Sequence, residues 1–143
     1  MPYITLSELI DRYGERRIVD LTDRGDLSTG VIDADTVARA IADTDAVIDG
    51  YLAAKYALPL AETPPMIADL AQAICIYKLH SYEPDGKVQA DYEQALKMLA
   101  QISSGTIRIP GASGIEPATT GGSGARVTDR ERPMTEASLK GFV

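Results

Sequence analysis

The sequence of 143 residues contains no tryptophan, one phenylalanine, one cysteine and one histidine. The single cysteine, Cys75, excludes an intramolecular disulfide bond and a cysteine-rich zinc site. The single histidine, His80, excludes a metal site built from several histidines and leaves only one possible base for a Ser-His-Asp triad. No apolar run approaches the about 18 residues that a membrane-spanning helix requires. The first residues also lack the basic and apolar regions of a signal peptide, so we expect a cytoplasmic protein.

Positive charge is scarce as well. Lysine and arginine number 14 against 21 aspartates and glutamates, which gives a formal net charge of −7. The imbalance lies wholly within residues 1–109, which carry 10 basic and 17 acidic residues, whereas residues 110–143 carry four of each. General binding to nucleic acid or to an anionic membrane requires clustered positive charge. The composition therefore excludes both as the main function of the chain.

The residues that often carry catalysis or bind metals occur in patterns that favour structural roles. The aspartates between residues 20 and 49 do not follow the spacing of a calcium-binding EF-hand loop, so a solvated acidic face explains them better. Cys75 lies in an apolar stretch, and His80 follows the end of that stretch, where a helix dipole stabilises a cationic ring. The glycines of residues 121–124 match no phosphate-binding motif. We expect no catalytic residue, no metal site and no cofactor.

Hydrophobic spacing predicts an all-α protein. A capping box of Thr5 and Glu8 begins the first helix, and Gly14 ends it. Gly50 weakens the longest predicted helix and is expected to permit close packing. We expect a small bundle of three long helices plus one or two short helices at the N-terminus. The predicted helices cover residues 5–13, 17–22, 34–56, 64–79 and 88–103, the first residue of the fourth being Pro64 with Thr63 as its cap.

The fourth of these helices is apolar nearly all round and should be the central one. One packed cluster between the three long helices is expected to form the core. Its predicted members are Ile41, Ile48, Ile67, Leu70, Ile74, Leu96 and Leu99.

The part of the chain after Gly105 changes in character. Polar and apolar side chains alternate along residues 106–109. This alternation predicts a short β segment that presents Ile107 and Ile109 to a partner strand. Residues 110–133 are rich in glycine, serine and proline and should act as a tether to the helical body of residues 1–109. Residues 134–143 are apolar again, and two readings stay open: an extended arm that docks, or a frayed terminus. The candidate docking residues are Met134, Leu139, Phe142 and Val143.

Several segments together resemble a known family. They are residues 3–9, the block IDGYLAAKYALPL at residues 48–60, Pro64-Pro65 with the apolar helix that follows, and residues 132–142. Their order resembles a family of small proteins of Mu-like prophages, formerly a domain of unknown function, and is similar to the helical head-tail connector, or adaptor, proteins of tailed phages. The glycine at position 50 and the length of the glycine-rich tail depart from the pattern.

The resemblance implies a structural virion protein that forms a ring, of twelve copies, at the head-tail junction. Its implied partners are other copies of itself, the portal protein and a tail terminator or stopper protein, with DNA only passing through and no membrane involved. It implies neither enzymatic activity nor a cofactor. The implied location is the virion, after assembly in the host cytoplasm.

A connector must let DNA pass without binding it, so the acidic charge suggests a negative channel wall. We name Asp43, Asp45 and Asp49 as its candidates, beside the alternative that they face solvent on the outer surface. A different class of function also stays open: a small cytoplasmic helical module that regulates or binds another protein. That alternative explains the acidic helices but not the C-terminal arm.

Overall fold

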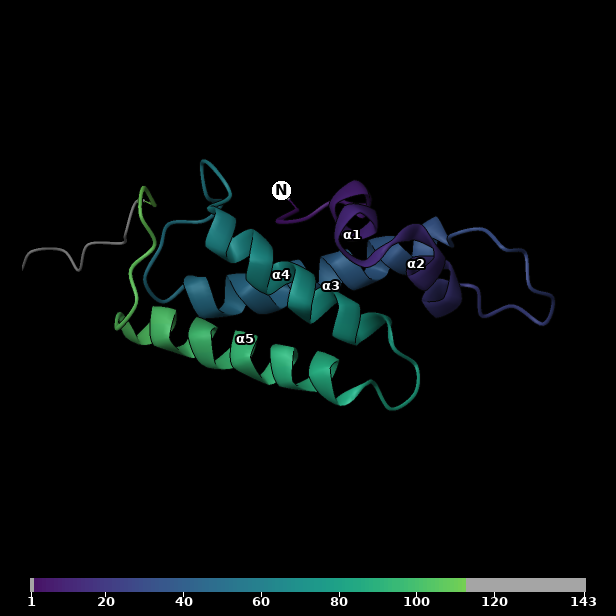
Figure 1. The fold of residues 1–143 in the computed structure, drawn as a ribbon. Coiled ribbons are helices and arrows are strands. Elements are labelled where there is room, and N and C mark those ends of the chain that lie inside the picture. The colour runs from purple at the N-terminus through teal and green to yellow at the C-terminus, as the bar shows by residue number, and fades with distance from the viewer. Residues whose placement is uncertain (1, 113–143) are drawn as a thin grey trace, which may run out of the picture.

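The computed structural model describes residues 2–112 as a bundle of helices (Figure 1). Its five helices are α1 (Leu6–Tyr13), α2 (Glu15–Thr22), α3 (Ala34–Leu52), α4 (Pro65–Leu79) and α5 (Gly86–Ser104). The prediction of an all-α fold is confirmed, and the described residues form three long helices and two short ones. The boundaries proposed at residues 109, 110 and 133 stay predictions, since residues 113–143 lie outside the described part of the chain.

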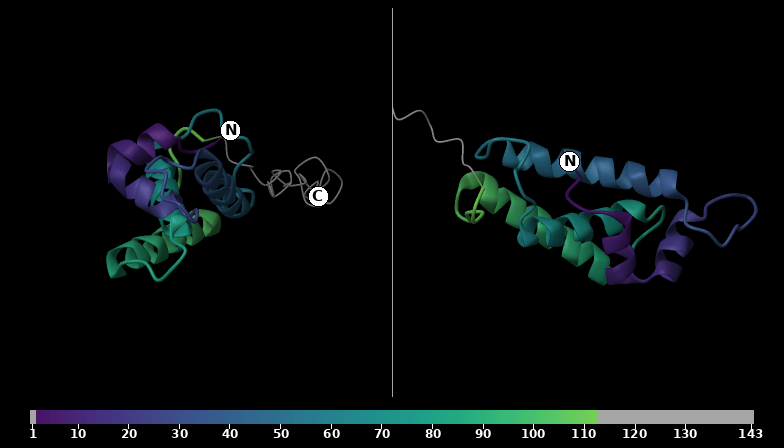
Figure 2. Two further views of the ribbon diagram at one scale, coloured as in Figure 1. Left: turned by 90° about the vertical axis from the view of Figure 1, so that its right-hand side faces the viewer. Right: turned by 90° about the horizontal axis from the view of Figure 1, so that it is seen from above.

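The three long helices run alongside one another, and α4 packs against both α3 and α5 (Figures 1 and 2). The short helices α1 and α2 pack on each other near one end of the bundle. Helix α4 is the most apolar and the most buried of the five, as predicted, because it has neighbours on several sides. Its buried residues are Ile67, Leu70, Ala71, Ala73, Ile74, Cys75, Ile76 and Leu79.

The predicted core is largely confirmed. Two of its seven members, Ile41 and Leu96, are only half-buried, although both pack against the core. The other five are buried: Ile48, Ile67, Leu70, Ile74 and Leu99. The N-terminal segment adds Tyr3 and Ile4 to this cluster.

The predicted start of α1 is confirmed in its atomic detail. The Glu8 backbone N–H donates to Thr5 Oγ1 at 3.4 Å, and the Thr5 N–H donates to Glu8 Oε2 at 2.7 Å. Gly14 has a φ of 86°, and its N–H donates to the Ile10 carbonyl at 2.8 Å. Because glycine adopts this conformation without strain, the chain passes directly from α1 into α2.

Helix α3 begins as predicted, with the Asp33 carboxylate accepting from the Asp35 and Thr36 N–H groups. It ends at Leu52, however, four residues before the predicted end. Tyr56 is buried, and its hydroxyl accepts a hydrogen bond from the Ile109 N–H at 3.0 Å. The expectation of close packing at Gly50 is wrong, because a Cβ added there would meet no atom within 4 Å.

Helix α4 begins one residue later than predicted. Pro64 is the N-cap and has an extended backbone, with ψ at 143°, and its carbonyl accepts from the Ile67 and Ala68 N–H groups. A proline disfavours a helical conformation in the residue before it, so Pro65 keeps Pro64 out of the helix. Thr63 therefore does not cap this helix.

Helix α5 ends at the predicted stop, since Gly105 has the left-handed conformation with φ at 83°. The N–H groups of Thr106 and Ile107 then fold back to the Gln101 carbonyl, at 2.9 and 3.2 Å. Residues 106–109 form bends and irregular structure, not a strand. The predicted β segment is not confirmed in the described part of the chain, because these hydrogen bonds turn the backbone around the end of α5.

Candidate functional site

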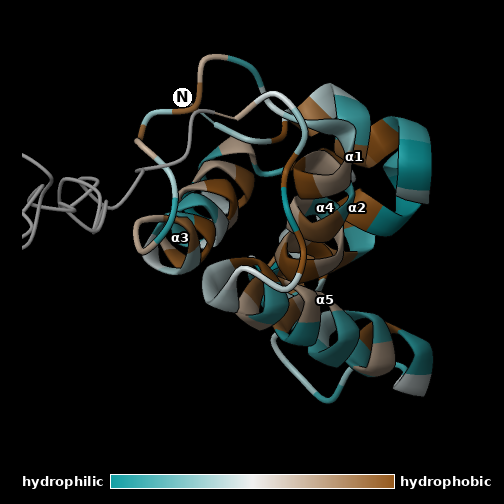
Figure 3. Ribbon diagram, turned by 90° about the vertical axis from the view of Figure 1, so that its left-hand side faces the viewer, coloured by the Kyte–Doolittle hydropathy of each residue, from teal (hydrophilic) through white to brown (hydrophobic). Residues whose placement is uncertain are grey.

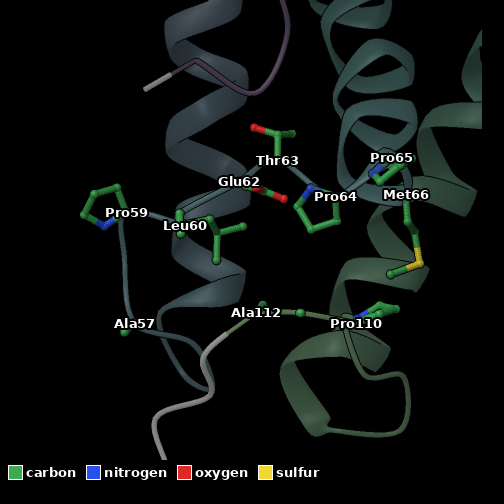
Figure 4. Close-up of a pocket in the computed structure, with 12 residues that line it drawn as sticks. Ala57, Pro59, Leu60, Glu62, Thr63, Pro64, Pro65, Met66, Pro110 and Ala112 are labelled. Carbon is green, nitrogen blue, oxygen red and sulfur yellow. The ribbon is translucent and has the colours of Figure 1, made fainter.

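A pocket opens at the end of the bundle where the described chain stops. It has a volume of about 410 Å³. Its walls come from the α3–α4 connection, the start of α4 and the segment after α5. In Figure 4, Leu60, Pro64 and Met66 stand on one side, with Pro110 and Ala112 opposite. The lining is mainly apolar, so the pocket can accept aliphatic or aromatic side chains but offers little for catalysis.

The segment after α5 is fixed to the body beside this pocket. Ile109 is buried, and its N–H group is bound by the Tyr56 hydroxyl, whereas Ile107 is half-buried and Arg108 is exposed. Figure 3 looks at this end of the molecule and shows the segment crossing the ends of the helices. In the single chain, Ile109 thus belongs to the core of its own body. The roles of Ile107 and Ile109 in partner binding stay predictions.

The remaining predicted docking residues lie outside the described residues. They are Met134, Leu139, Phe142 and Val143. The structure shows where the described chain ends before them: Ala112, the last described residue, lies in the pocket wall.

The three aspartates predicted for the channel differ in their surroundings on α3. Asp45 accepts a hydrogen bond from the Tyr3 N–H at 3.0 Å, and Asp49 accepts one from the Tyr3 hydroxyl. Both are half-buried, and burial raises the pKa of Asp45 above its usual value. Asp43 is exposed. Sequence reasoning did not anticipate that Asp45 and Asp49 fasten the N-terminal segment to the bundle.

The loop between α2 and α3 exposes large apolar side chains, which sequence reasoning missed. It projects beyond the helices at the end opposite the pocket (Figures 1 and 2) and exposes Leu27 by 83% and Val31 by 65%. Asp23 organises the loop: its carboxylate accepts from the Gly30 N–H at 3.0 Å and from the Ser28 hydroxyl at 2.7 Å. These hydrogen bonds hold the pKa of Asp23 below its usual value. The available signal was the presence of large aliphatic residues in an otherwise polar loop.

His80 and Cys75 have the structural surroundings expected of them. The His80 ring nitrogen Nδ1 lies 2.7 Å from the Ile76 carbonyl, which places the ring at the C-terminal end of α4. Cys75 is fully buried, and burial raises the pKa of its thiol to about 11. Within residues 2–112 the structure brings together no group of three His, Cys, Asp or Glu side chains that could hold a metal ion. None of the helices described there is long and apolar enough to cross a membrane.

Comparison with known proteins identifies relatives in phages and prophages. The family model described as "Bacteriophage Mu, Gp36" matches residues 3–128. The chain is 29% identical to Gene product J of Escherichia phage Mu over 143 residues, which is 100% of both chains. It is 27% identical to the Mu-like prophage FluMu protein gp36 of Haemophilus influenzae over 112 residues, or 78% of this chain and 79% of the relative. Neither relative carries the name of an enzyme.

Proposed function

We propose that this chain, which belongs to the Bacteriophage Mu Gp36 family, is a structural protein of the virion that forms a ring at the head-tail junction. Membership in a phage family over most of the chain is the observation that carries the proposal. The fold is compatible with it: a small helical body, a pocket without catalytic groups, and a further 31 residues that leave from the pocket wall. The proposed role is mechanical, and we propose no catalytic step and no cofactor.

The ring consists of copies of this chain, twelve in our proposal. It joins the portal protein on the head side to a tail terminator or stopper protein on the tail side. Residues 134–143 serve as the docking peptide, with Met134, Leu139, Phe142 and Val143 as its apolar anchors. Ile107 contributes at the base of the arm, because its side chain is only half-buried in the single chain. A buried aromatic ring contributes a large apolar area, so Phe142 is the strongest of these anchors.

The channel of the ring presents aspartates of α3 to the passing DNA. Of the three candidates, Asp43 is the most exposed, and Asp45 and Asp49 also hold Tyr3. Repeating this charge around a ring makes the wall repel the DNA phosphates, which keeps the duplex from binding. A map of the neck in which lysine and arginine line the lumen would refute this part of the proposal.

The proposal is tested by removing the chain from a phage that encodes it. We expect DNA-filled heads and complete tails that remain separate, and purified full-length chain added to such heads should restore joining. Electron cryomicroscopy of the restored particles should then show a ring between portal and tail. Particles that join without the chain contradict the proposal.

The alternative, a small helical regulatory module, predicts a different distribution of the protein in the infected cell. A regulator stays in the cytoplasm and does not copurify with particles. The connector is retained in purified particles through steps that remove loosely bound protein. Mass spectrometry of those particles distinguishes the two functions.

A further inference from the structure

We infer that copies of this chain associate head to tail, with the α2–α3 loop of one copy seated in the pocket at the opposite end of the next. The inference deepens the proposed ring and rests on that part of the proposed function. It gives a partner to two features that have none within the described chain. They are the exposed side chains of Leu27 and Val31 and the apolar pocket of about 410 Å³.

The loop has the properties of a preformed docking element. Leu27 and Val31 are, with Tyr82, the large hydrophobic residues that are exposed within residues 2–112. The four hydrogen bonds to the Asp23 carboxylate come from Ser28, from Gly30 and, through both backbone and hydroxyl, from Thr29. A loop that is ordered before binding loses less conformational entropy on association. Less of the free energy from its apolar contacts is therefore offset, and the affinity is higher.

The pocket has matching size and chemistry. Its volume falls within the about 300–1,000 Å³ that is typical of binding pockets, which leaves room for two aliphatic side chains. Its lining contains Leu60, Pro64, Met66 and Pro110, and Glu62 is its one charged residue. Seating Leu27 and Val31 there removes apolar surface of both partners from water.

Charge favours the same pairing. The loop and its flanks, residues 20–39, are acidic, with five aspartates against two arginines, Arg24 and Arg39. The pocket end exposes Lys55 and Arg108, with Glu62 in the pocket wall. Lys55 and Arg108 attract the aspartates of another copy's loop, whereas two loops repel each other. The aspartates on the loop side are Asp20, Asp23, Asp26, Asp33 and Asp35.

The placement of the two features determines the kind of assembly. Loop and pocket lie at opposite ends of the body (Figures 1 and 2), so they cannot meet within one chain. A contact between different surfaces of identical chains is heterologous, and it generates a closed ring when the rotation between copies closes. Self-complementary association, in contrast, stops at a dimer.

Disulfide trapping tests the contact in the full-length chain. The variant Leu27→Cys/Ala61→Cys places one thiol on the loop and one at the exposed pocket wall. The native Cys75 is fully buried, and it does not compete for oxidation in the folded protein. The matched control Leu27→Cys/Gln94→Cys moves the second thiol to an exposed position in the middle of α5. Both variants are oxidised as purified protein and in particles assembled with them.

We expect a ladder of disulfide-linked chains from the first variant and not from the control. The inference is overturned if the first variant gives no ladder either as purified protein or in particles. It is also overturned if the control variant gives an equal ladder. If the chain is retained in particles without the specific ladder, the contact is wrong while the proposed function stands. If purified particles lack the chain, it is the proposed function that fails.

A second measurement separates the loop from the C-terminal peptide as the occupant of the pocket. Leu27→Asp should weaken self-association of the purified chain about tenfold or more, the usual effect of losing a central apolar contact. Phe142→Asp should leave it unchanged. Both are followed by sedimentation over a concentration series. The reverse result, with Phe142→Asp dissociating the copies and Leu27→Asp harmless, assigns the pocket to the C-terminal peptide and overturns the inference.

Discussion

At the scale of single residues, Tyr3 connects the N-terminal segment to α3 through two aspartates. Its backbone N–H binds Asp45 and its hydroxyl binds Asp49, while its ring is buried in the core. The sequence places Tyr3 before a helix start but gives no indication of this contact, because its partners lie on another helix. Interactions of this kind depend on how whole elements pack, and spacing along the chain does not encode them.

Tyr3→Phe removes the hydroxyl and leaves the half-buried Asp49 carboxylate without this donor. We expect a loss of about 1.5–3 kcal/mol in the free energy of unfolding, the usual range for a hydrogen bond to a charged acceptor. Urea unfolding measures it. Tyr82→Phe is the matched control, because Tyr82 is 68% exposed, and it should change the stability by less than about 0.5 kcal/mol. Equal stability of Tyr3→Phe and the native chain contradicts the assigned contact.

The same tyrosine predicts a pH dependence. Burial, together with the hydrogen bond to Asp49, raises the pKa of Tyr3 above its usual value. The unfolded chain therefore releases this proton at lower pH than the folded chain does. The stability contributed by neutral Tyr3 is complete below about pH 10 and is lost as the pH rises further. Urea unfolding at a series of alkaline pH values should show a steeper loss for the native chain than for Tyr3→Phe, and parallel curves would refute the assignment.

Leu70 tests the predicted core at α4. Its side chain is only 4% exposed, between helices that pack on both sides of α4. Leu70→Ala removes these contacts and leaves a cavity, so we expect a destabilisation of about 2–5 kcal/mol. Thermal and urea unfolding measure it, with Gln94→Ala, at an exposed position of α5, as the control. An unchanged melting temperature for Leu70→Ala would contradict the packing described for α4.

At the scale of elements, the sequence predicts helix boundaries that local caps set better than a boundary that depends on a tertiary contact. The caps at Thr5 and Asp33 are local, since a side chain binds backbone groups within three residues. The early end of α3 depends instead on Tyr56, whose hydroxyl binds a residue after α5. Helical periodicity continues through residue 56 in the sequence, so only the tertiary contact shows that the helix has already stopped.

Replacement of two glycines by alanine should change the stability of the chain in opposite directions. Gly50 is exposed inside α3, so Gly50→Ala should stabilise the chain by about 0.5–1 kcal/mol through helix propensity and reduced freedom of the unfolded state. Gly105 has a φ of 83°, so Gly105→Ala should cost about 1–2 kcal/mol in backbone strain. Urea unfolding of both variants checks the pair. If Gly50→Ala destabilises the chain, another chain or segment must pack against the surface of α3 at this position.

At the scale of the whole molecule, composition and helical spacing predict an acidic all-α body, but neither the pocket at one end nor the exposed apolar side chains at the other. The pocket is built from residues around position 60 and around position 110, and only the fold brings these together. The exposure of Leu27 and Val31 could not be predicted either, because it depends on where the α2–α3 loop lies relative to the bundle. The C-terminal arm stays a prediction, and it rests on the difference in composition between residues 110–143 and the body.

The arm supplies the last prediction at this scale. Deleting residues 134–143 removes the four predicted apolar anchors and keeps the described body together with residues 113–133. We expect unchanged helix content and melting temperature, because the described core is complete without these residues. Binding to portal-bearing heads should be lost or much weaker, since ordering the tether costs entropy that only docked contacts offset. Circular dichroism and cosedimentation with heads measure the two effects.

A full-length variant distinguishes a lost anchor from a shortened chain. Leu139→Ala/Phe142→Ala should weaken binding to heads nearly as much as the deletion, because these side chains carry most of the apolar area of the peptide. Thr135→Ala, a polar change in the same peptide, should bind heads as the native chain does. Self-association should be unaffected by all three changes, since the copies meet through the α2–α3 loop. If the deleted chain binds heads as tightly as the native one, the peptide is no anchor, and attachment must depend on the helical body alone.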